Sequence, residues 1–137
     1  MTSGNNLVII AAGGPGHSLQ FYQQTLGGAT WNPEPVAGTS TSCSAPSMTT
    51  NSAGITIAAA GPGGSLDFYW QLFGAATWNP EQVAGTSTTY SAPSMTTNSS
   101  GVTIAAGGPS KSLDFYWQLF GDTTWNPEQV APPGSMG

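Results

Sequence analysis

The stretch SLDFYWQLFG (residues 65–74), followed by TWNPE (residues 77–81), decides the fold because it recurs along the chain. Both segments return unchanged at residues 112–121 and 124–128. A more divergent copy, SLQFYQQ with TWNPE, occupies residues 18–24 and 30–34. Leu19, Leu66 and Leu113 are spaced 47 residues apart. The chain therefore consists of three copies of one unit, at residues 1–40, 41–87 and 88–137. The first copy lacks part of its first strand, and the third ends in a tail.

The composition indicates a folded chain that does not bind nucleic acid. Only 5% of the 137 residues are charged, with no Arg and a single Lys, and the formal net charge is −5. Nucleic acids and anionic membrane surfaces are bound through clustered cations, so neither is an expected partner. Five Trp, five Phe and four Tyr supply the apolar core that disordered chains lack. No apolar run approaches the ~20 residues of a membrane helix, so membrane insertion is not expected. The opening residues MTSGNN lack the basic region of a signal peptide.

Each unit is expected to form four short strands. In the second unit, residues 44–50, 55–60, 66–72 and 77–83 combine β-branched, aromatic or small residues, and turn-forming residues separate them. Side chains alternate along a strand, so Leu66, Phe68 and Trp70 are expected on one face and the intervening residues on the other. Pro80 interrupts the fourth run, which indicates an edge strand that can spare a hydrogen-bond donor.

Four antiparallel strands in a repeat of about 40–50 residues are typical of a β-propeller blade. We therefore predict an all-β protein in which the three 47-residue repeats are blades of four antiparallel strands. A β-trefoil also has three repeats of similar size and is the competing architecture. Four strands per unit and the edge-like fourth strand favour the propeller.

Three blades cannot close a ring by themselves, since propellers typically have ~4–8 blades. Three repeat lengths exceed the chain length by four residues, and the segment missing at a head-to-tail junction corresponds to residues 91–94. We therefore predict a homo-oligomer, a head-to-tail dimer that forms a six-bladed ring, because heterologous contacts close when the rotation permits. The alternative is that the chain is a piece of a longer propeller.

The segments SAPS, AAxGPxxSLDFYWQ and WNPExVAG together resemble a known blade repeat. They are similar to the repeat of bacterial propeller lectins related to the fucose-binding lectin of Photorhabdus, and to repeats of uncharacterised actinobacterial proteins. The resemblance covers essentially the whole chain. It implies a closed propeller that binds L-fucose and O-methylated sugars between adjacent blades, with the SAPS strand innermost and the WNPE strand outermost. Those lectins have about seven blades, within the usual range for propellers, so assembly or fragmentation must account for the three repeats here.

A sugar site combines an aromatic platform for the ring with a few fixed donors and acceptors for its hydroxyls. The repeats offer Trp as a platform, Asp as a bidentate acceptor, and Tyr and Asn as groups that both donate and accept. The predicted carbohydrate-binding residues are Asp67, Tyr69, Trp70, Asn79, Tyr90, Asp114, Tyr116, Trp117 and Asn126.

The first unit differs from the others at two of these positions together. Gln23 replaces Trp70, and Gln20 replaces Asp67. In addition, Cys43 stands one repeat length before Tyr90, in its place. Truncating a structural Trp costs ~3–5 kcal/mol, so the joint change is interpreted as a binding site kept in two units and lost or altered in the first. The alternatives are that the Trp packs between blades and that the Asp caps a nearby turn.

Two further positions do not vary between the units. The tryptophans of the WNPE segment are expected to pack between blades: Trp31, Trp78 and Trp125. The glutamates that follow proline are expected to be solvated: Glu34, Glu81 and Glu128.

No catalytic site, metal site or cofactor is predicted. His17 is the only imidazole and Cys43 the only thiol, so neither a nucleophile–base pair nor a transition-metal cluster can be assembled. Asp67 and Glu81 could be imagined as a glycosidase pair, but a pair that repeats fits repeated binding sites better than one catalytic centre. The sequence therefore predicts a multivalent lectin for fucosylated or methylated glycans and not an enzyme. The alternative is a ligand-free structural or engineered self-assembling propeller fragment.

Overall fold

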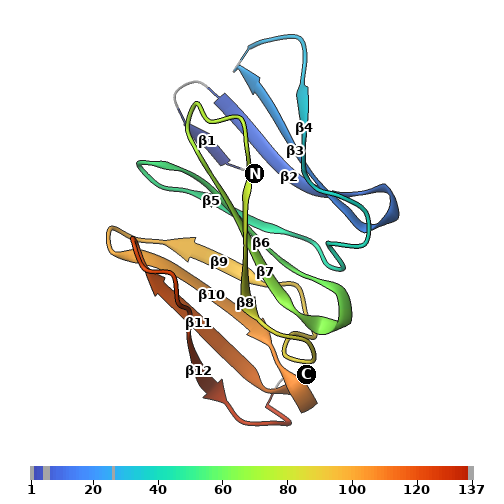
Figure 1. Ribbon diagram of the computed structural model, residues 1–137, viewed down its shortest axis with the longest axis vertical. Coiled ribbons are helices and arrows are strands. Elements are labelled where there is room, and N and C mark those ends of the chain that lie inside the picture. The colour runs from blue at the N-terminus through green and yellow to red at the C-terminus, as the bar shows by residue number, and fades with distance from the viewer. Residues whose placement is uncertain (1, 5–6, 26, 136–137) are drawn as a thin grey trace.

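The computed structural model describes residues 2–4, 7–25 and 27–135, which form three four-stranded antiparallel sheets (Figure 1). The N-terminal sheet contains β1 (Thr2–Gly4), β2 (Leu7–Gly14), β3 (Ser18–Thr25) and β4 (Asn32–Ala37). The middle sheet contains β5 (Ser47–Thr50), β6 (Gly54–Ala60), β7 (Leu66–Leu72) and β8 (Asn79–Ala84). The C-terminal sheet contains β9 (Ser94–Thr97), β10 (Gly101–Gly107), β11 (Leu113–Leu119) and β12 (Asn126–Ala131). Three short 3-10 turns join the second and third strands: η1 (Pro15–His17), η2 (Pro62–Gly64) and η3 (Pro109–Lys111).

The all-β prediction is confirmed, and each sheet lies within one of the three sequence units. In every sheet the strands follow one another in chain order, so each is a simple antiparallel meander. No helix in the described part of the chain is long and apolar enough to cross a membrane.

The strands of the middle sheet match the predicted runs closely, except at β5. This strand begins at Ser47 instead of residue 44. Pro46 has no N–H to donate, and just before it the hydroxyl of Ser44 accepts a hydrogen bond from the backbone N–H of Ala60 (3.0 Å) in place of a ladder bond. At the other side of the sheet, β8 pairs with β7 alone among the described strands and carries Pro80, which confirms the predicted edge strand.

The middle sheet packs on both faces. Leu66 and Phe68 of β7 face the C-terminal sheet and share a core cluster with Ile104. The opposite face places Ile57 and Tyr69 against the N-terminal sheet. Burial of apolar surface on both sides contributes the main stabilising term, at roughly 25 cal/mol per Å².

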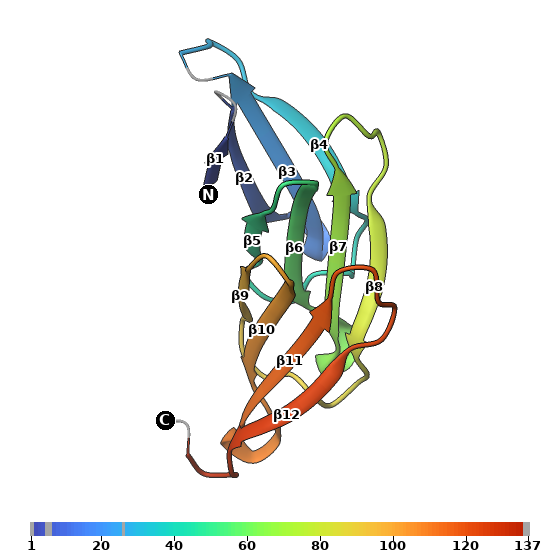
Figure 2. The same cartoon turned by 90° about the vertical axis from the view of Figure 1, so that its left-hand side faces the viewer.

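The three sheets converge along the side of their first strands. Figure 2 shows β1, β5 and β9 along one side of the molecule, with β4, β8 and β12 along the other. The first strands contact each other, and two hydrogen bonds connect β5 with β9. One runs from the backbone N–H of Met95 to Oγ of Ser47 (3.0 Å), and the other from Oγ1 of Thr97 to the carbonyl of Thr50 (3.1 Å).

The 3-10 turns need two successive residues in the left-handed region. In η2 these are Gly63 and Gly64, with φ of 69° and 78°. In η3 Ser110 and Lys111 occupy the same positions, with φ of 55° and 64°, which costs an L-residue roughly 1–2 kcal/mol. The segment that leaves each sheet then docks on this turn. For example, the backbone N–H of Ser87 donates to the carbonyl of Gly63 (2.8 Å).

Candidate functional site

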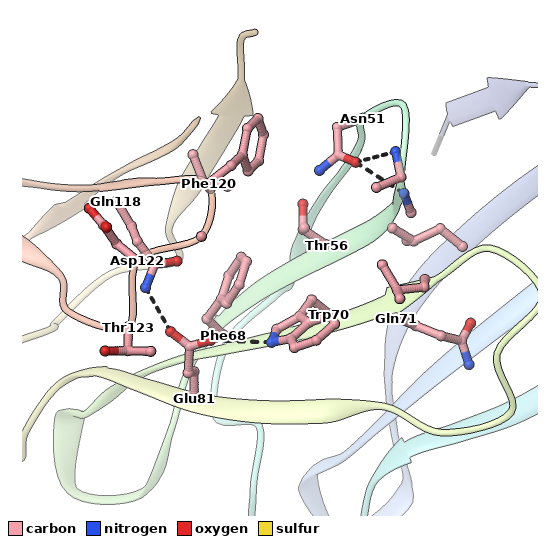
Figure 3. Close-up of a pocket in the computed structure, with 16 residues that line it drawn as sticks. Asn51, Thr56, Phe68, Trp70, Gln71, Glu81, Gln118, Phe120, Asp122 and Thr123 are labelled. Atoms are coloured by element: carbon pink, nitrogen blue, oxygen red, sulfur yellow. Dashed lines mark hydrogen bonds between the residues drawn. The ribbon is translucent and has the colours of Figure 1, made fainter. Parts of the chain in front are cut away.

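A cavity of about 390 Å³ lies between the middle and C-terminal sheets, where β6 begins and β7 ends (Figure 3). The middle sheet contributes Thr56, Trp70 and Glu81 to its lining, and the C-terminal sheet contributes Gln118 and Asp122. Pockets for small ligands typically have volumes of ~300–1,000 Å³ and are mostly apolar with a few converging polar groups. The cavity has the size and composition of such a pocket.

Trp70 reaches the cavity because of its position on β7. It shares a face with Leu66 and Phe68, which are fully buried further along the strand. Trp70 follows them in this row, before the exposed Leu72, and its indole is half-buried at the end of the core. One side of the ring therefore packs on the core cluster while another borders the cavity.

The carboxylate of Glu81 holds the two sheets together at the cavity. Oε1 accepts hydrogen bonds from Nε2 of Gln118 (2.9 Å) and from Nε1 of Trp125 (2.9 Å). Gln118 lies on β11 of the C-terminal sheet, and Trp125 immediately precedes β12. Oε2 accepts from Nε1 of Trp70 (3.2 Å), within its own sheet. In Figure 3 Glu81 lies between Trp70 and Gln118. Hydrogen bonds to an ionised acceptor are about twice as strong as neutral ones, so this contact stabilises the packing of the sheets.

The same arrangement joins the N-terminal and middle sheets. Oε1 of Glu34 accepts from Nε2 of Gln71 (2.7 Å) and from Nε1 of Trp78 (2.9 Å). We call each set, a Glu of one sheet with a Gln and a Trp of the next, a carboxylate clamp. The prediction that these glutamates are solvated is wrong for Glu34 and Glu81, which are half-buried, while Glu128 is exposed.

The predicted packing role of the WNPE tryptophans is seen in two of the three. The ring of Trp78 packs edge-to-face on Phe21, with centroids 5.3 Å apart, and Trp125 packs in the same way on Phe68 at 5.1 Å. These contacts bridge neighbouring sheets and confirm the packing prediction for both residues. Trp31, in contrast, is 41% exposed.

Three polar groups at the cavity keep unused hydrogen-bonding capacity. A carboxylate oxygen has two acceptor positions, so Oε1 of Glu81 is filled while Oε2 retains one. Asn51 uses Oδ1 to accept from the N–H groups of Ala53 (2.7 Å) and Gly54 (3.0 Å), and its amide NH₂ lies at the cavity. Asp122 is exposed, and its carboxylate makes no hydrogen bond to any residue that the structure describes.

Two of the predicted residues, Tyr69 and Tyr116, belong to the core. Each is 6% exposed, and neither lines the cavities described here. Burial raises the pKa of Tyr69 to about 12, and the charge of Asp67 adds to the shift. Burial, followed by the charge of Asp114, also raises the pKa of Tyr116. Both phenols are therefore neutral packing groups at neutral pH.

Asp67 and Asp114 lie beside the turns that precede their strands. Oδ2 of Asp67 accepts from Oγ of Ser65 (3.2 Å) and lies against Gly61, where an added methyl group would collide with it. Asp114 repeats this arrangement with Ser112 (3.3 Å). Burial raises the pKa of Asp67, an effect that the Ser65 hydrogen bond opposes. These contacts agree with the turn-capping alternative.

Asp67 and Trp70 do not share a site, although they change together in the first unit. They are separated by three positions on one strand, and an odd separation places side chains on opposite faces. Trp70 faces the C-terminal sheet, whereas Asp67 shares the face of Tyr69, which packs toward the N-terminal sheet. Their joint change therefore does not mark one pocket.

The remaining predicted residues are distributed over the molecule. Nδ2 of Asn79 donates to the carbonyl of Trp70 (3.2 Å), and Asn126 does the same to Trp117 (3.3 Å), which aligns the edge strands with their neighbours. Trp117 lines a hollow on the outer face of the C-terminal sheet. Tyr90 is 63% exposed and lines a cavity of about 450 Å³ at the other end of β6.

Sequence reasoning missed Glu81, Gln118 and Asp122 as cavity residues. The Glu and Gln recur in all three units together with the clamp Trp, and this joint invariance was the available signal. Asp122 has no such signal, because Ala75 and Gly28 occupy its place in the other units.

The site offers hydrogen bonding and apolar contact. Within the described ranges, no three His, Cys, Asp or Glu side chains gather as a metal site. No protein-family model and no curated protein matches this chain.

Proposed function

We propose that this chain is a multivalent carbohydrate-binding protein whose sugar sites lie between neighbouring sheets. The observation that carries the proposal is the cavity of about 390 Å³ between the middle and C-terminal sheets, where an indole stands beside two carboxylates and an amide. A sugar ring needs an apolar surface for its C–H groups and fixed acceptors for its hydroxyls, and this cavity provides both.

The arrangement fits a sugar that carries a methyl group. Leu72 and Phe120 extend the apolar lining beyond Trp70, and both are exposed, so a methyl substituent would cover apolar surface there. Burying one methyl or methylene group is favourable by about 0.8 kcal/mol. Hydroxyls on the other side of the ring would donate to Asp122 and to the free position on Glu81. Fucosylated or O-methylated glycans, the ligands that the resemblance of the repeat implies, meet this description.

We further propose that the three sheets are blades of a β-propeller that is closed by oligomerisation. The convergence of β1, β5 and β9 along one side supports the proposal, as does the edge strand on the other side of the middle sheet. Two chains joined head to tail would supply six blades. Several weak sites on one ring would raise the avidity for a surface of glycans by ~10²–10⁴.

A glycan array, with L-fucose titration followed by Trp fluorescence, tests the proposal. Asp122→Ala is the sharpest variant, because the side chain is exposed and its removal leaves the carboxylate clamps intact. We expect it to weaken binding by about tenfold or more, since a hydrogen bond to a charged group contributes about 1.5–3 kcal/mol. Gln129→Ala, at an exposed position on β12, is the matched control and should bind as the wild type does.

A ligand-free, self-assembling propeller fragment is the second candidate, and one observation favours it. The indole N–H of Trp70 is already used by Glu81, so this Trp has a structural role whether or not a ligand binds. If no glycan is retained on the array and L-fucose leaves the fluorescence of the assembled protein unchanged, the lectin proposal fails and this candidate stands.

A further inference from the structure

The outer face of the C-terminal sheet carries part of a second cavity. A hollow of about 360 Å³ there is lined by ten residues, and each is the 47-residue counterpart of a residue that lines the first cavity. Trp117 corresponds to Trp70, and Glu128 corresponds to Glu81. Six more residues complete the first cavity, and all six come from the sheet that follows. Among the residues that the structure describes, none covers this outer face in the same way, so the second site is incomplete there.

The burial pattern identifies this outer face as an uncovered packing face. Leu66 is 0% and Phe68 is 3% exposed, because the C-terminal sheet covers them. Their counterparts Leu113 and Phe115 are only half-buried. The difference arises from position alone, since the side chains are identical.

The N-terminal sheet has the complementary uncovered face. Tyr116 and Gln118 of the C-terminal sheet are buried against the middle sheet, but their counterparts Tyr22 and Gln24 are half-buried. Trp31, the counterpart of the clamp residue Trp125, is exposed at 41%. The N-terminal sheet therefore presents the Gln and Trp of a carboxylate clamp, and the C-terminal sheet presents the matching Glu128.

We propose that the N-terminal sheet of a second copy of this chain docks on the C-terminal sheet and completes a second binding site there. Glu128 would accept hydrogen bonds from Gln24 and Trp31 of the partner subunit, as Glu81 does from Gln118 and Trp125. The ring of the partner's Trp31 would pack on Phe115, as Trp125 packs on Phe68. The inference deepens the proposed function and rests on it, because the completed cavity over Trp117 would take the same class of sugar.

The direction of the chain after β12 agrees with this docking. The segments that lead from one sheet to the next dock on the preceding 3-10 turn, through Ser40 on Gly16 and Ser87 on Gly63, both at 2.8 Å. Gly134 donates to the carbonyl of Ser110 at the same distance. The residues after β12 thus follow the path that elsewhere leads to the neighbouring sheet.

The junction site differs from the first cavity in one acceptor. The turn that covers it would be the partner's, and there Gly28 occupies the position of Asp122. The junction site therefore lacks the exposed carboxylate but keeps the indole and the clamp glutamate. We expect it to bind the same sugar more weakly, by about tenfold or more, because the first site has the additional charge-assisted hydrogen bond that Asp122 accepts.

Light scattering after size exclusion, over a range of concentrations, tests the docking. The wild type should have a mass of about two chains of 13.9 kDa. Trp31→Ala and Glu128→Ala should each weaken association by about tenfold or more, with unchanged circular dichroism because both side chains are exposed. Gln129→Ala, on the same strand as Glu128, should associate normally. A monomeric wild type, or variants that assemble as the wild type does, would overturn the docking.

Calorimetric titration with L-fucose separates this inference from the proposed function. The assembled wild type should show two classes of site per chain, and the monomeric variants should keep only the tighter one. Trp117→Ala in the assembled protein should remove the weaker class alone. A dimer that binds no sugar would leave the docking intact and refute the sugar site, whereas a monomer that binds one sugar would refute the docking alone.

Discussion

Removal of the Glu81 carboxylate should destabilise the contact between the middle and C-terminal sheets more than any other single change on β8. Glu81→Ala deletes three hydrogen bonds to an ionised acceptor, from Trp70, Gln118 and Trp125. Such bonds contribute about 1.5–3 kcal/mol each when buried, but Glu81 is half-buried and the three bonds are not additive. We therefore expect the free energy of unfolding to fall by about 3 kcal/mol, and Tm by about 10 °C for a chain of this length.

The assay is urea denaturation followed by Trp fluorescence at one fixed protein concentration, because association shifts the apparent stability. Gln82→Ala is the matched control, since Gln82 is the next residue on β8 and is exposed. A double-mutant cycle with Trp125→Phe isolates one bond, because the Phe ring can still pack on Phe68. We expect a coupling energy of about 1 kcal/mol. A Glu81→Ala variant within ~0.5 kcal/mol of the Gln82→Ala control, the usual range for surface changes, would refute the clamp.

Three further predictions concern the pH dependence and the backbone. The pKa of Tyr69 is raised to about 12 from 10.0, so the folded protein holds a proton that the unfolded chain has lost. Stability should therefore decline as the pH rises from about 10 to 12, and Tyr69→Phe should flatten this part of a denaturation-versus-pH curve. Gly54→Ala places a methyl group against the carbonyl of Gln71 across the β6–β7 ladder. It should lower the free energy of unfolding, measured by urea denaturation, by about 1–3 kcal/mol. Ala53→Ser, at the adjacent exposed position, should leave it unchanged. Lys111→Gly relieves a left-handed residue, as Gly64 does in η2, and should raise Tm by a few degrees; an unchanged or lower Tm would contradict the strain.

The repeat and its strands could be predicted from the sequence because local patterns specify them. The alternating residues from Leu66 to Trp70 predicted a strand with Leu66, Phe68 and Trp70 on one face, and Pro80 predicted an edge strand. Both features depend only on residues a few positions apart. They can therefore be predicted without knowing how the sheets pack.

The candidate site was harder to predict because its contacts link different units. Glu81 bonds residues 37 and 44 positions further along the chain, while its local context, after a proline near a turn, indicates a solvated residue. Asp67 and Trp70 both change in the first unit, which suggested a shared site. Their odd separation along the strand, however, places the two side chains on opposite faces. Asp122 occurs in one unit only, so the repeat pattern gives no indication of its role.

The middle sheet lies between the two other sheets, and this position affects the order in which the sheets unfold. All seven residues of β6 are buried, and the middle sheet shares one interface with each neighbour. In a linear stack of this kind, stability is approximately a sum of intrinsic terms for each sheet and coupling terms between nearest neighbours. An end sheet can open by breaking one coupling term, whereas the middle sheet must break two. In an unassociated chain we therefore expect the outer sheets to open before the middle sheet, and association between chains should suppress this opening.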